Sequence, residues 1–283
     1  MSKKAFIIGH PIKHSVSPFM HNAAFGERGI DCLYDLKDVK PRDLKKIFEE
    51  LRQPEVIGFN VTVPHKEAVL PLLDDLSKPA QIIGAVNTVV NENGKLIGHN
   101  TDGAGFIESL KEDAKFEPKE KNVVVIGAGG ASRAITVMLA EAEIDFLTVT
   151  DIQEEKAQEL LEYLSSYFQL NCNFAAPNSE ELQAAIDRAD ILINCSPVGM
   201  HPKEKENPLS PQIKLHSDLL VYDLVYNPRE TQLLKTAKAA GAQACSGLGM
   251  LVRQGALAFT LWTGQEAPVQ TMRQAAEKAL GLS

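Results

Sequence analysis

The sequence is poor in cysteine, in aromatic residues and in long apolar runs. Its 283 residues include four cysteines, spread along the chain without a Cys-x-x-Cys pair, and one tryptophan. This spacing argues against a disulfide scaffold or a zinc site, so we expect reduced thiols and no bound metal. No apolar run approaches the roughly 20 residues that a membrane-spanning helix needs. The short apolar start is broken by Gly9-His10-Pro11, so we expect no signal peptide and a cytoplasmic location.

The sequence also has fewer basic than acidic residues. Lysine and arginine number 29 against 37 aspartates and glutamates, which leaves a net charge of −8. Because a nucleic-acid-binding surface needs a basic footprint, we expect neither nucleic acid nor a membrane as a partner. The hydrophobic share of 44% and the charged share of 23% lie in the ordinary globular range. The length fits one large domain or two ordinary ones.

Predicted strands and helices alternate along nearly the whole chain. We expect strands at 5–8, 33–36, 57–63, 85–90, 95–99, 123–126, 146–150, 173–175, 191–194, 221–225 and near 244. We expect helices at 17–26, 42–52, from 64 onward, and at 104–111, 131–142, 154–168, 179–186, 231–240, 248–263 and 268–280. Such alternation predicts an α/β protein built from parallel β-α-β units in a doubly wound sheet. The pattern changes near residues 102–105 and again near Gly247, which are the expected domain boundaries.

A glycine-rich segment directly follows the predicted strand 123–126. It reads Gly127-Ala128-Gly129-Gly130-Ala131 and leads into a predicted helix. Glycines in this context allow a tight turn and close approach of backbone N–H groups to a pyrophosphate, and the helix N-terminus adds partial positive charge. The spacing departs from the simple Gly-x-Gly-x-x-Gly form. A dinucleotide site is favoured, and an ordinary strand-to-helix turn is the alternative.

Asp151 ends the next predicted strand, 151 − 127 = 24 residues after the first glycine of this loop. A carboxylate there accepts hydrogen bonds from a ribose 2′-hydroxyl and repels a 2′-phosphate. We therefore expect NAD as the preferred cofactor, with NADP as the alternative. Asp151 could also serve only as a helix cap. If NADP is preferred, Lys156 or Arg133 would meet the phosphate.

Polar side chains cluster in the loops and strands of the first half. Ser17 precedes Pro18 and is expected to cap a helix, which makes Ser15 the better ligand candidate. Asn60 and Thr62 alternate along an apolar strand and should share one face.

Two further polar positions of the first half stand out. Lys66 falls in the first turn of a predicted helix, where a cation is electrostatically unfavourable and so indicates a functional role. An ordinary solvated surface lysine is an equally good interpretation. Asn87 lies in an apolar strand, and residues 100–103 lie at the predicted domain junction, where two-domain proteins bind ligands.

Seven motifs, in order along the chain, together resemble the shikimate/quinate dehydrogenase family. They are His-Ser-x-Ser-Pro at 14–18, Asn-x-Thr-x-Pro-x-Lys at 60–66, Asn-Thr-Asp-Gly at 100–103, the glycine loop at 127–132, Asn-Cys-Ser-Pro-Val-Gly-Met at 194–200, Tyr-Asp-Leu-Val-Tyr at 222–226, and Gly-Leu-Gly-Met-Leu-Val-x-Gln at 247–254. The motifs span nearly the whole chain, which makes the resemblance specific.

The resemblance implies a substrate domain at residues 1–102, completed by helices at 248–283, and a Rossmann NAD(P)-binding domain at 103–247. It implies reversible oxidation of shikimate to 3-dehydroshikimate in aromatic amino-acid metabolism. Lys66 and Asp102 would be the catalytic pair, which titrates as a coupled unit. The substrate ligands carried over by position would be Ser15, Ser17, Asn60, Thr62, Lys66, Asn87, Asp102, Tyr226 and Gln254. The cofactor residues would be Gly127, Ala128, Gly129, Gly130, Ala131, Asp151, Leu224 and Gly247.

One departure from the family bears on the cofactor and the substrate. The NADP-using members carry Asn-Arg-Thr or Asn-Arg-Ser after the second Rossmann strand, whereas this chain has Thr150-Asp151-Ile152. The missing arginine favours NAD and a quinate/shikimate dehydrogenase, with an NADP-dependent biosynthetic shikimate dehydrogenase as the alternative. Ser17 is the shikimate-type residue, so we expect shikimate as the better substrate and quinate as a second one.

Two other functions compete with this interpretation. A different two-domain enzyme, such as a methylene-tetrahydrofolate dehydrogenase, would share the architecture and a lysine but not the motif at 14–18. A non-catalytic NAD or metabolite sensor would share the fold, because fold does not fix function. Family members include monomers and homodimers, so either state is expected.

Overall fold

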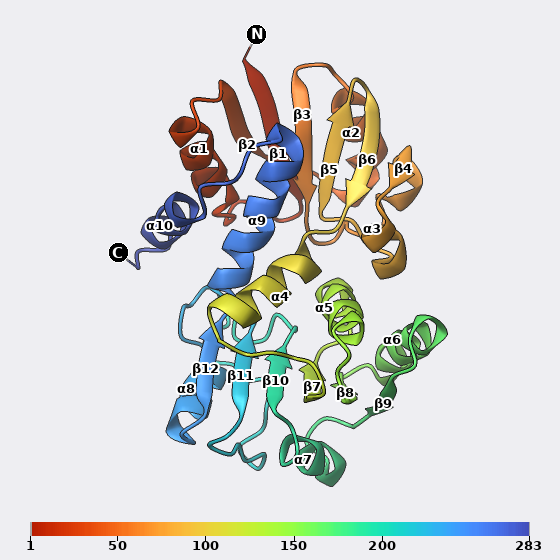
Figure 1. Cartoon of the computed structure of the whole chain (residues 1–283), viewed down its shortest axis with the longest axis vertical. Helices are drawn as coiled ribbons and strands as arrows, with labels where there is room; N and C mark the ends of the chain where they lie inside the picture. The colour runs from red at the N-terminus through yellow and green to blue at the C-terminus, as the bar shows by residue number, and fades with distance from the viewer. Residues whose placement is uncertain (1, 283) are drawn as a thin grey trace. The chain divides into compact units, whose positions relative to one another are not determined.

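The computed structural model describes residues 2–282 and divides into two compact units. Unit 1 contains the residues up to 105 and those from 251 onward, and unit 2 contains residues 106–250. The chain leaves unit 1 within helix α4 (Asp102–Glu112) and returns to it within helix α9 (Leu248–Thr263) (Figure 1). Unit 1 is therefore made from two separate stretches of sequence.

The sheet of unit 1 is mixed. Its six strands lie in the order β2 (Cys32–Asp38), β1 (Lys3–Gly9), β3 (Val56–Val61), β5 (Thr88–Glu92), β6 (Lys95–His99) and β4 (Asp75–Leu76). Strand β1 runs parallel to both β2 and β3, and β4 runs parallel to β6. Strand β5 is antiparallel to β3 and to β6. The β5–β6 hairpin turns at Asn93 and Gly94, both with positive φ, as the predicted Asn-Gly turn requires.

Helices cover both faces of this sheet (Figure 1). Helices α2 (Leu44–Glu50) and α3 (Lys78–Ile83) share one apolar core with β3, in which Phe48 and Phe59 meet edge to face. Helices α1 (Ser17–Glu27) and α10 (Val269–Ala279) pack against each other, and α1 also packs on β2. The indole of Trp262, on α9, donates to the carbonyl of Val89 on β5 at 2.9 Å. Short 3₁₀ turns lie at Pro41–Asp43 and Leu70–Leu72.

The sheet of unit 2 is parallel throughout. Its strands lie in the order β12 (Gln243–Ser246), β11 (Leu220–Asp223), β10 (Ile191–Asn194), β7 (Asn122–Ile126), β8 (Phe146–Thr150) and β9 (Asn171–Phe174). The first strand of the unit, β7, lies in the middle, so the chain winds outward in one direction and then in the other. This is the doubly wound order that binds dinucleotides at the carboxyl ends of the strands, where the direction reverses.

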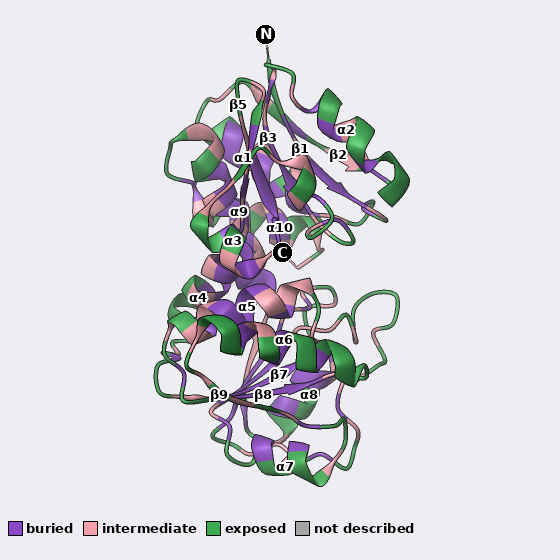
Figure 2. Cartoon of the chain, turned by 90° about the vertical axis from the view of Figure 1, so that its right-hand side faces the viewer, coloured by how far each residue is buried: buried purple, intermediate pink, exposed green. Residues whose placement is uncertain are grey.

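The helices of unit 2 are α5 (Gly130–Glu141), α6 (Glu154–Tyr167), α7 (Glu180–Ile186), α8 (Gln232–Ala239) and most of α4. One apolar core joins α7 and α8 to the strands through Leu182, Leu233, Val124, Leu192 and Val221. Figure 2 shows the strands buried and the outer sides of the helices exposed, which is the pattern that amphipathic helices on an apolar sheet produce.

The predicted fold class is confirmed, but a predicted helix starting at Pro64 is wrong. Residues 63–69 form turns. The carbonyl of Lys66 accepts from the N–H of Val86 at 2.8 Å, and the ring of His65 meets the carbonyl of Val39 at 2.6 Å. These long-range bonds hold the segment in turns, and its single bond of α-helical spacing, from Val69 to His65, does not extend into a helix. Helix α3, which begins after the cap formed by Ser77, and the two-residue strand β4 were not predicted.

Across residues 2–282, no helix is both long enough and apolar enough to cross a membrane. All four cysteines are free thiols, and burial raises the pKa of the Cys195 thiol to about 12.

The tight packing of Gly58 on β3 predicts a large effect of one added methyl group. A Cβ at Gly58 would stand 2.2 Å from the indole nitrogen of Trp262 and 2.4 Å from the carbonyl oxygen of Val89. Because that carbonyl is part of the sheet and cannot move aside, Gly58→Ala should lower the free energy of unfolding by about 3 kcal/mol or more. Thermal unfolding followed by circular dichroism measures this as a fall of about 6–12 °C.

Gly26→Ala is the matched control, because a Cβ on Gly26 in helix α1 would have no heavy atom within 4 Å. It should leave stability unchanged or raise it by about 0.5–1 kcal/mol, since alanine favours the helix. Equal melting temperatures for the two variants would contradict the packing argument.

Candidate active site

A lysine–aspartate pair lies at the centre of the candidate site in unit 1. Lys66 Nζ donates to Asp102 Oδ2 at 2.6 Å, and the two side chains are 18% and 9% exposed. Lys66 lies on the turns after β3, and Asp102 lies in the first turn of α4, where the helix dipole stabilises a carboxylate. The side chain of Asn100 accepts from the N–H of Asp102 and donates to the carbonyl of Ala85. Asn100 therefore holds the backbone at Asp102, and the bond from Val86 to the carbonyl of Lys66 holds the other end of the pair.

Asn87 holds the second oxygen of the same carboxylate. Its Nδ2 donates to Asp102 Oδ1 at 2.8 Å, and its Oδ1 accepts from the N–H of Thr101 at 2.7 Å. Because a backbone N–H can only donate and a carboxylate here can only accept, this amide has one orientation. Gln254 on α9 completes the group, with its Oε1 3.4 Å from Asn87 Nδ2.

Asn60 lies in the same cluster but is buried. It accepts from the hydroxyl of Tyr34 at 2.7 Å and donates to the carbonyl of Asn87 at 3.1 Å and to Thr88 Oγ1 at 3.0 Å. Thr62 follows β3 and is partly buried. The predicted residues of unit 1 that the structure brings together through hydrogen bonds are Asn60, Lys66, Asn87, Asp102 and Gln254.

The two serines of the motif at 14–18 lie at the start of helix α1, and neither side chain caps it. Helix α1 begins at Ser17 itself. The oxygen of Ser15 accepts from the N–H of Ser17 at 3.3 Å, so the local hydrogen bond belongs to Ser15. The prediction that Ser17 caps the helix is wrong, because Ser17 is already the first helical residue. Ser17 is buried, and both serines stay predicted substrate ligands.

The glycine loop of unit 2 has the shape that a pyrophosphate needs. Gly127 has φ +97°, and a Cβ there would stand 3.1 Å from the N–H of Ser196. A Cβ on Gly129, the residue before α5, would have no heavy atom within 4 Å, so a phosphate group has room to approach the backbone. Ser132 donates to the carbonyl of Gly127 at 2.6 Å, which holds the turn. Gly130 and Ala131 form the first turn of α5, so all five predicted loop residues lie at the N-terminus of a helix.

Asp151 braces this loop with both of its oxygens. Oδ2 accepts from the N–H of Ala128 at 2.8 Å, and Oδ1 accepts from the N–H of Gln153 at 2.8 Å. The carboxylate joins the glycine loop to the segment that enters α6. About half of the acceptor positions of this carboxylate are thus directed at backbone groups of the protein.

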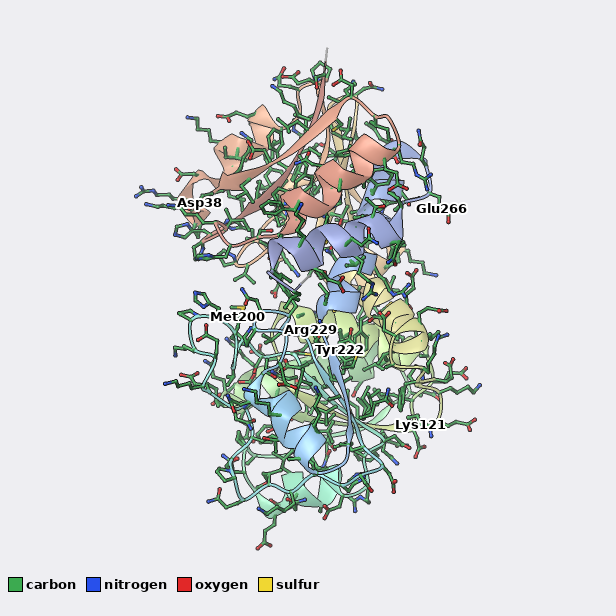
Figure 3. All side chains as sticks on the ribbon, turned by 90° about the vertical axis from the view of Figure 1, so that its left-hand side faces the viewer. Asp38, Lys121, Met200, Tyr222, Arg229 and Glu266 are labelled. Carbon is green, nitrogen blue, oxygen red and sulfur yellow. The ribbon has the colours of Figure 1, made fainter. Side chains whose placement is uncertain are left out.

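A second buried carboxylate, Asp223, organises the loops after β10 and β11. It accepts from Thr231 Oγ1 at 2.6 Å and from Asn194 Nδ2 at 2.9 Å, while Asn194 Oδ1 accepts from the N–H of Ser196 at 3.0 Å. Burial raises the pKa of Asp223. Asn194 and Asp223 were not predicted as site residues, although both lie in motifs that the sequence shows. Figure 3 shows Met200 and Arg229 on the two loops that this network joins.

Three predicted residues lie on these loops or beside them. Leu224 and Gly247 pack so closely that a Cβ on Gly247 would stand 2.0 Å from the carbonyl oxygen of Leu224, so only glycine fits. Tyr226 is partly buried, and burial raises its pKa. All three belong to unit 2, and their contacts with cofactor or substrate stay predictions.

Three family models match this chain. They are the shikimate dehydrogenase substrate binding domain at residues 7–89, shikimate/quinate 5-dehydrogenase at residues 109–233, and the shikimate 5′-dehydrogenase C-terminal domain at residues 247–277. Together they cover most of the sequence.

Individual relatives match at full length. A protein of Methanopyrus kandleri named shikimate dehydrogenase (NADP(+)) is 46% identical over 95% of this chain and 93% of its own length. A crystal structure of a shikimate dehydrogenase in complex with NADP+ has a TM-score of 0.90 and 40% identity, covering 98% of this chain and 95% of that one. The Listeria monocytogenes shikimate 5-dehydrogenase with shikimate and NAD has a TM-score of 0.90 and 36% identity, covering 96% of each chain.

These relatives correct the predicted cofactor preference for NAD. The Methanopyrus protein is named as NADP(+)-dependent, and so are further relatives at 40–44% identity. The prediction rested on Asp151, each of whose oxygens accepts from one backbone N–H in the structure. The names of the relatives overturn the NAD preference built on that residue.

The fold, the paired Lys66 and Asp102, the braced glycine loop and the full-length matches agree with one another. The chain belongs to the shikimate dehydrogenase family of oxidoreductase enzymes.

Proposed function

We propose that this protein catalyses the reversible, NADP-dependent oxidation of shikimate to 3-dehydroshikimate, a reaction of aromatic amino-acid biosynthesis. The observation that carries the proposal is the Lys66–Asp102 pair, with its 2.6 Å hydrogen bond and its support from Asn87. Oxidation of an alcohol needs a group that takes the hydroxyl proton, and a positioned lysine is suited to that role. The names of the relatives support shikimate as the substrate and NADP as the cofactor.

We assign substrate binding to unit 1. A polyol such as shikimate both donates and accepts at every hydroxyl, which suits amide and hydroxyl side chains. Asn87 and Gln254 lie beside the catalytic pair, and Thr62 lies on the segment between β3 and Lys66. Ser15 and Ser17 would hold the substrate carboxylate. Asn60 completes the proposed set in unit 1, and Tyr226, which belongs to unit 2, is proposed as a further ligand.

Lys66 and Asp102 divide the chemistry between them. The uncharged amine of Lys66 takes the proton of the reacting hydroxyl in oxidation, and the ammonium so formed returns it in reduction. Asp102 accepts from both Lys66 and Asn87, which directs the amine and orients the hydroxyl. NADP+ held by unit 2 supplies the hydride acceptor for this reaction.

We assign cofactor binding to the glycine loop and the neighbouring loops of unit 2. Gly127, Ala128, Gly129, Gly130 and Ala131 form the pyrophosphate turn, and Leu224 and Gly247 would lie near the nicotinamide. Lys156 is exposed in the first turn of α6, whereas the guanidinium of Arg133 stacks 3.9 Å above the ring of Tyr163. Of these two cations, we propose Lys156 as the one that meets the 2′-phosphate.

The proposed reaction predicts shikimate-dependent reduction of NADP by the purified wild-type protein. We expect kcat/KM with NADP to exceed that with NAD by about tenfold or more, since one charge-assisted hydrogen bond to the 2′-phosphate contributes about 1.5–3 kcal/mol. Absorbance at the reduced nicotinamide band follows the reaction, with quinate as the second substrate. A higher kcat/KM with NAD, or binding of both ligands without turnover, would reject the proposal.

The catalytic role of Lys66 predicts a loss of turnover on its removal. Lys66→Ala should lower kcat by about 10²–10⁴-fold, which is the usual contribution of a general base. Lys45→Ala is the matched control, because Lys45 is exposed on α2. If the Lys66 variant keeps near wild-type kcat, Lys66 is not the proton acceptor.

The brace formed by Asp151 predicts a loss of affinity for both cofactors. Asp151→Ala removes two hydrogen bonds to the backbone, so KM for NADP and for NAD should both rise, by about three- to tenfold. Gln153→Ala is the control, because it keeps the N–H that bonds to Asp151. A lower KM for NADP with a higher KM for NAD would show instead that Asp151 discriminates between the cofactors.

A further inference from the structure

A buried chain of hydrogen bonds leads from β2 to the catalytic carboxylate. Tyr34 donates to Asn60 Oδ1 at 2.7 Å, and Asn60 donates to Thr88 Oγ1 at 3.0 Å. Thr88 donates to Asn87 Oδ1 at 3.1 Å, and Asn87 donates to Asp102 Oδ1 at 2.8 Å. All of these side chains belong to unit 1, and each residue is less than a tenth exposed.

The two amides of this chain have the same orientation, with the oxygen toward Tyr34 and the nitrogen toward Asp102. Asn60 Nδ2 also donates to the carbonyl of Asn87, which can only accept, so Asn60 Oδ1 must face Tyr34. Asn87 Oδ1 accepts from the N–H of Thr101, which can only donate, so its Nδ2 must face the carboxylate. Hydrogen bonds aligned in one direction polarise and strengthen one another.

Tyr34, the first donor, is held firmly in place. The side chain of Asn22 bonds to both the N–H and the carbonyl of Tyr34, at 2.8 and 2.9 Å. The ring of His21 stacks on the phenol ring at a centroid distance of 4.4 Å, and Trp262 lies on the same cluster at 5.9 Å. Burial raises the pKa of Tyr34 well above its ordinary value, and a hydrogen bond with Ser17 offsets this in part, so the hydroxyl keeps its proton at neutral pH.

We propose that Tyr34 and Thr88 are positioning residues of the catalytic pair. Through Asn60 and Asn87 they fix the amide that holds Asp102, and so set the carboxylate against Lys66 and the substrate hydroxyl. Neither residue needs to touch the substrate. This inference rests on the proposed function, because its effect appears in turnover.

The protein contains a second buried tyrosine that serves as a matched control for Tyr34. Tyr222 in unit 2 is also fully buried and donates to Ser109 Oγ at 2.8 Å, but it takes no part in the chain that ends on Asp102. Tyr34→Phe and Tyr222→Phe each remove one buried phenolic hydroxyl. The hydroxyl of Tyr34 bonds to Asn60 and Ser17, and that of Tyr222 bonds to Ser109 and the backbone of Met250. We expect similar falls in melting temperature for the two variants.

Their turnover should differ. With shikimate and NADP, we expect Tyr34→Phe to lower kcat by about tenfold with KM for NADP unchanged, because a mutation away from the reacting atoms lowers turnover when it displaces a catalytic group. We expect Tyr222→Phe to keep kcat within about twofold of the wild-type value. Equal kcat for the two variants would overturn the inference while the proposed function stands.

A second pair of variants, at Thr88, tests the middle of the chain of hydrogen bonds. Thr88→Val keeps the shape of the side chain but removes the hydroxyl, whereas Thr88→Ser keeps the hydroxyl. Thr88→Val should lose about as much kcat as Tyr34→Phe, and Thr88→Ser should retain most of it. Equal turnover of these two variants would also overturn the inference, even if Tyr34→Phe fails to fold. A wild-type protein inactive with both NADP and NAD would reject the proposed function first, and this inference with it.

Discussion

The candidate site depends on how unit 1 accommodates one carboxylate away from water. A buried charge without partners destabilises a protein by several kcal/mol, and removal of one partner of a buried pair is similarly costly. Asp102 avoids this cost because Lys66 donates to one of its oxygens and Asn87 donates to the other. Its place in the first turn of α4 adds the partial positive charge of the helix N-terminus. The turns at 63–69, the β5 strand and Asn100 must all be in place for these partners to meet. The stability of the site and its chemistry therefore require the same contacts.

Asp151 and Asp223 in unit 2 are also held by hydrogen bonds, but their bonds shape loops and not a catalytic pair. Asp151 and Asp223 each stand at or just beyond the carboxyl end of a parallel strand and accept hydrogen bonds from the loops around them. They shape the loops on which a dinucleotide would lie and need not contact it. An acidic residue at the end of the second strand is often taken as a ribose ligand. Here Asp151 also bonds to Ala128 and Gln153, and its contact with a ribose stays a prediction. The cofactor preference built on that contact was wrong, because the relatives are named as NADP(+)-dependent.

Much of the fold could be predicted because its elements are local patterns. The apolar runs at β7, β8 and β10, the glycine loop and the Asn-Gly hairpin are visible in a few consecutive residues. The failures have long-range causes. Lys66 lies in a turn because its carbonyl bonds to Val86, twenty residues away (86 − 66 = 20). Tyr34 and Thr88 gave no signal as site residues, because their roles arise only when β2, β1, β3 and β5 lie side by side. Sequence could place Lys66 and Asp102 in a family motif, but not the geometry that joins them.

The interrupted order of unit 1 has a consequence for synthesis of the protein on the ribosome. Residues 106–250 form one continuous stretch, so unit 2 has all of its strands before the last part of the chain is made. The sheet of unit 1 emerges first, yet α10 and the part of α9 that carries Trp262 are translated last. The bond from Trp262 to Val89 spans 173 residues. Because domains generally fold as units during translation, the part of unit 1 that is made first waits with one face of its sheet incomplete while unit 2 is made. Nascent chains stalled before residue 251 would expose that apolar face to chaperones.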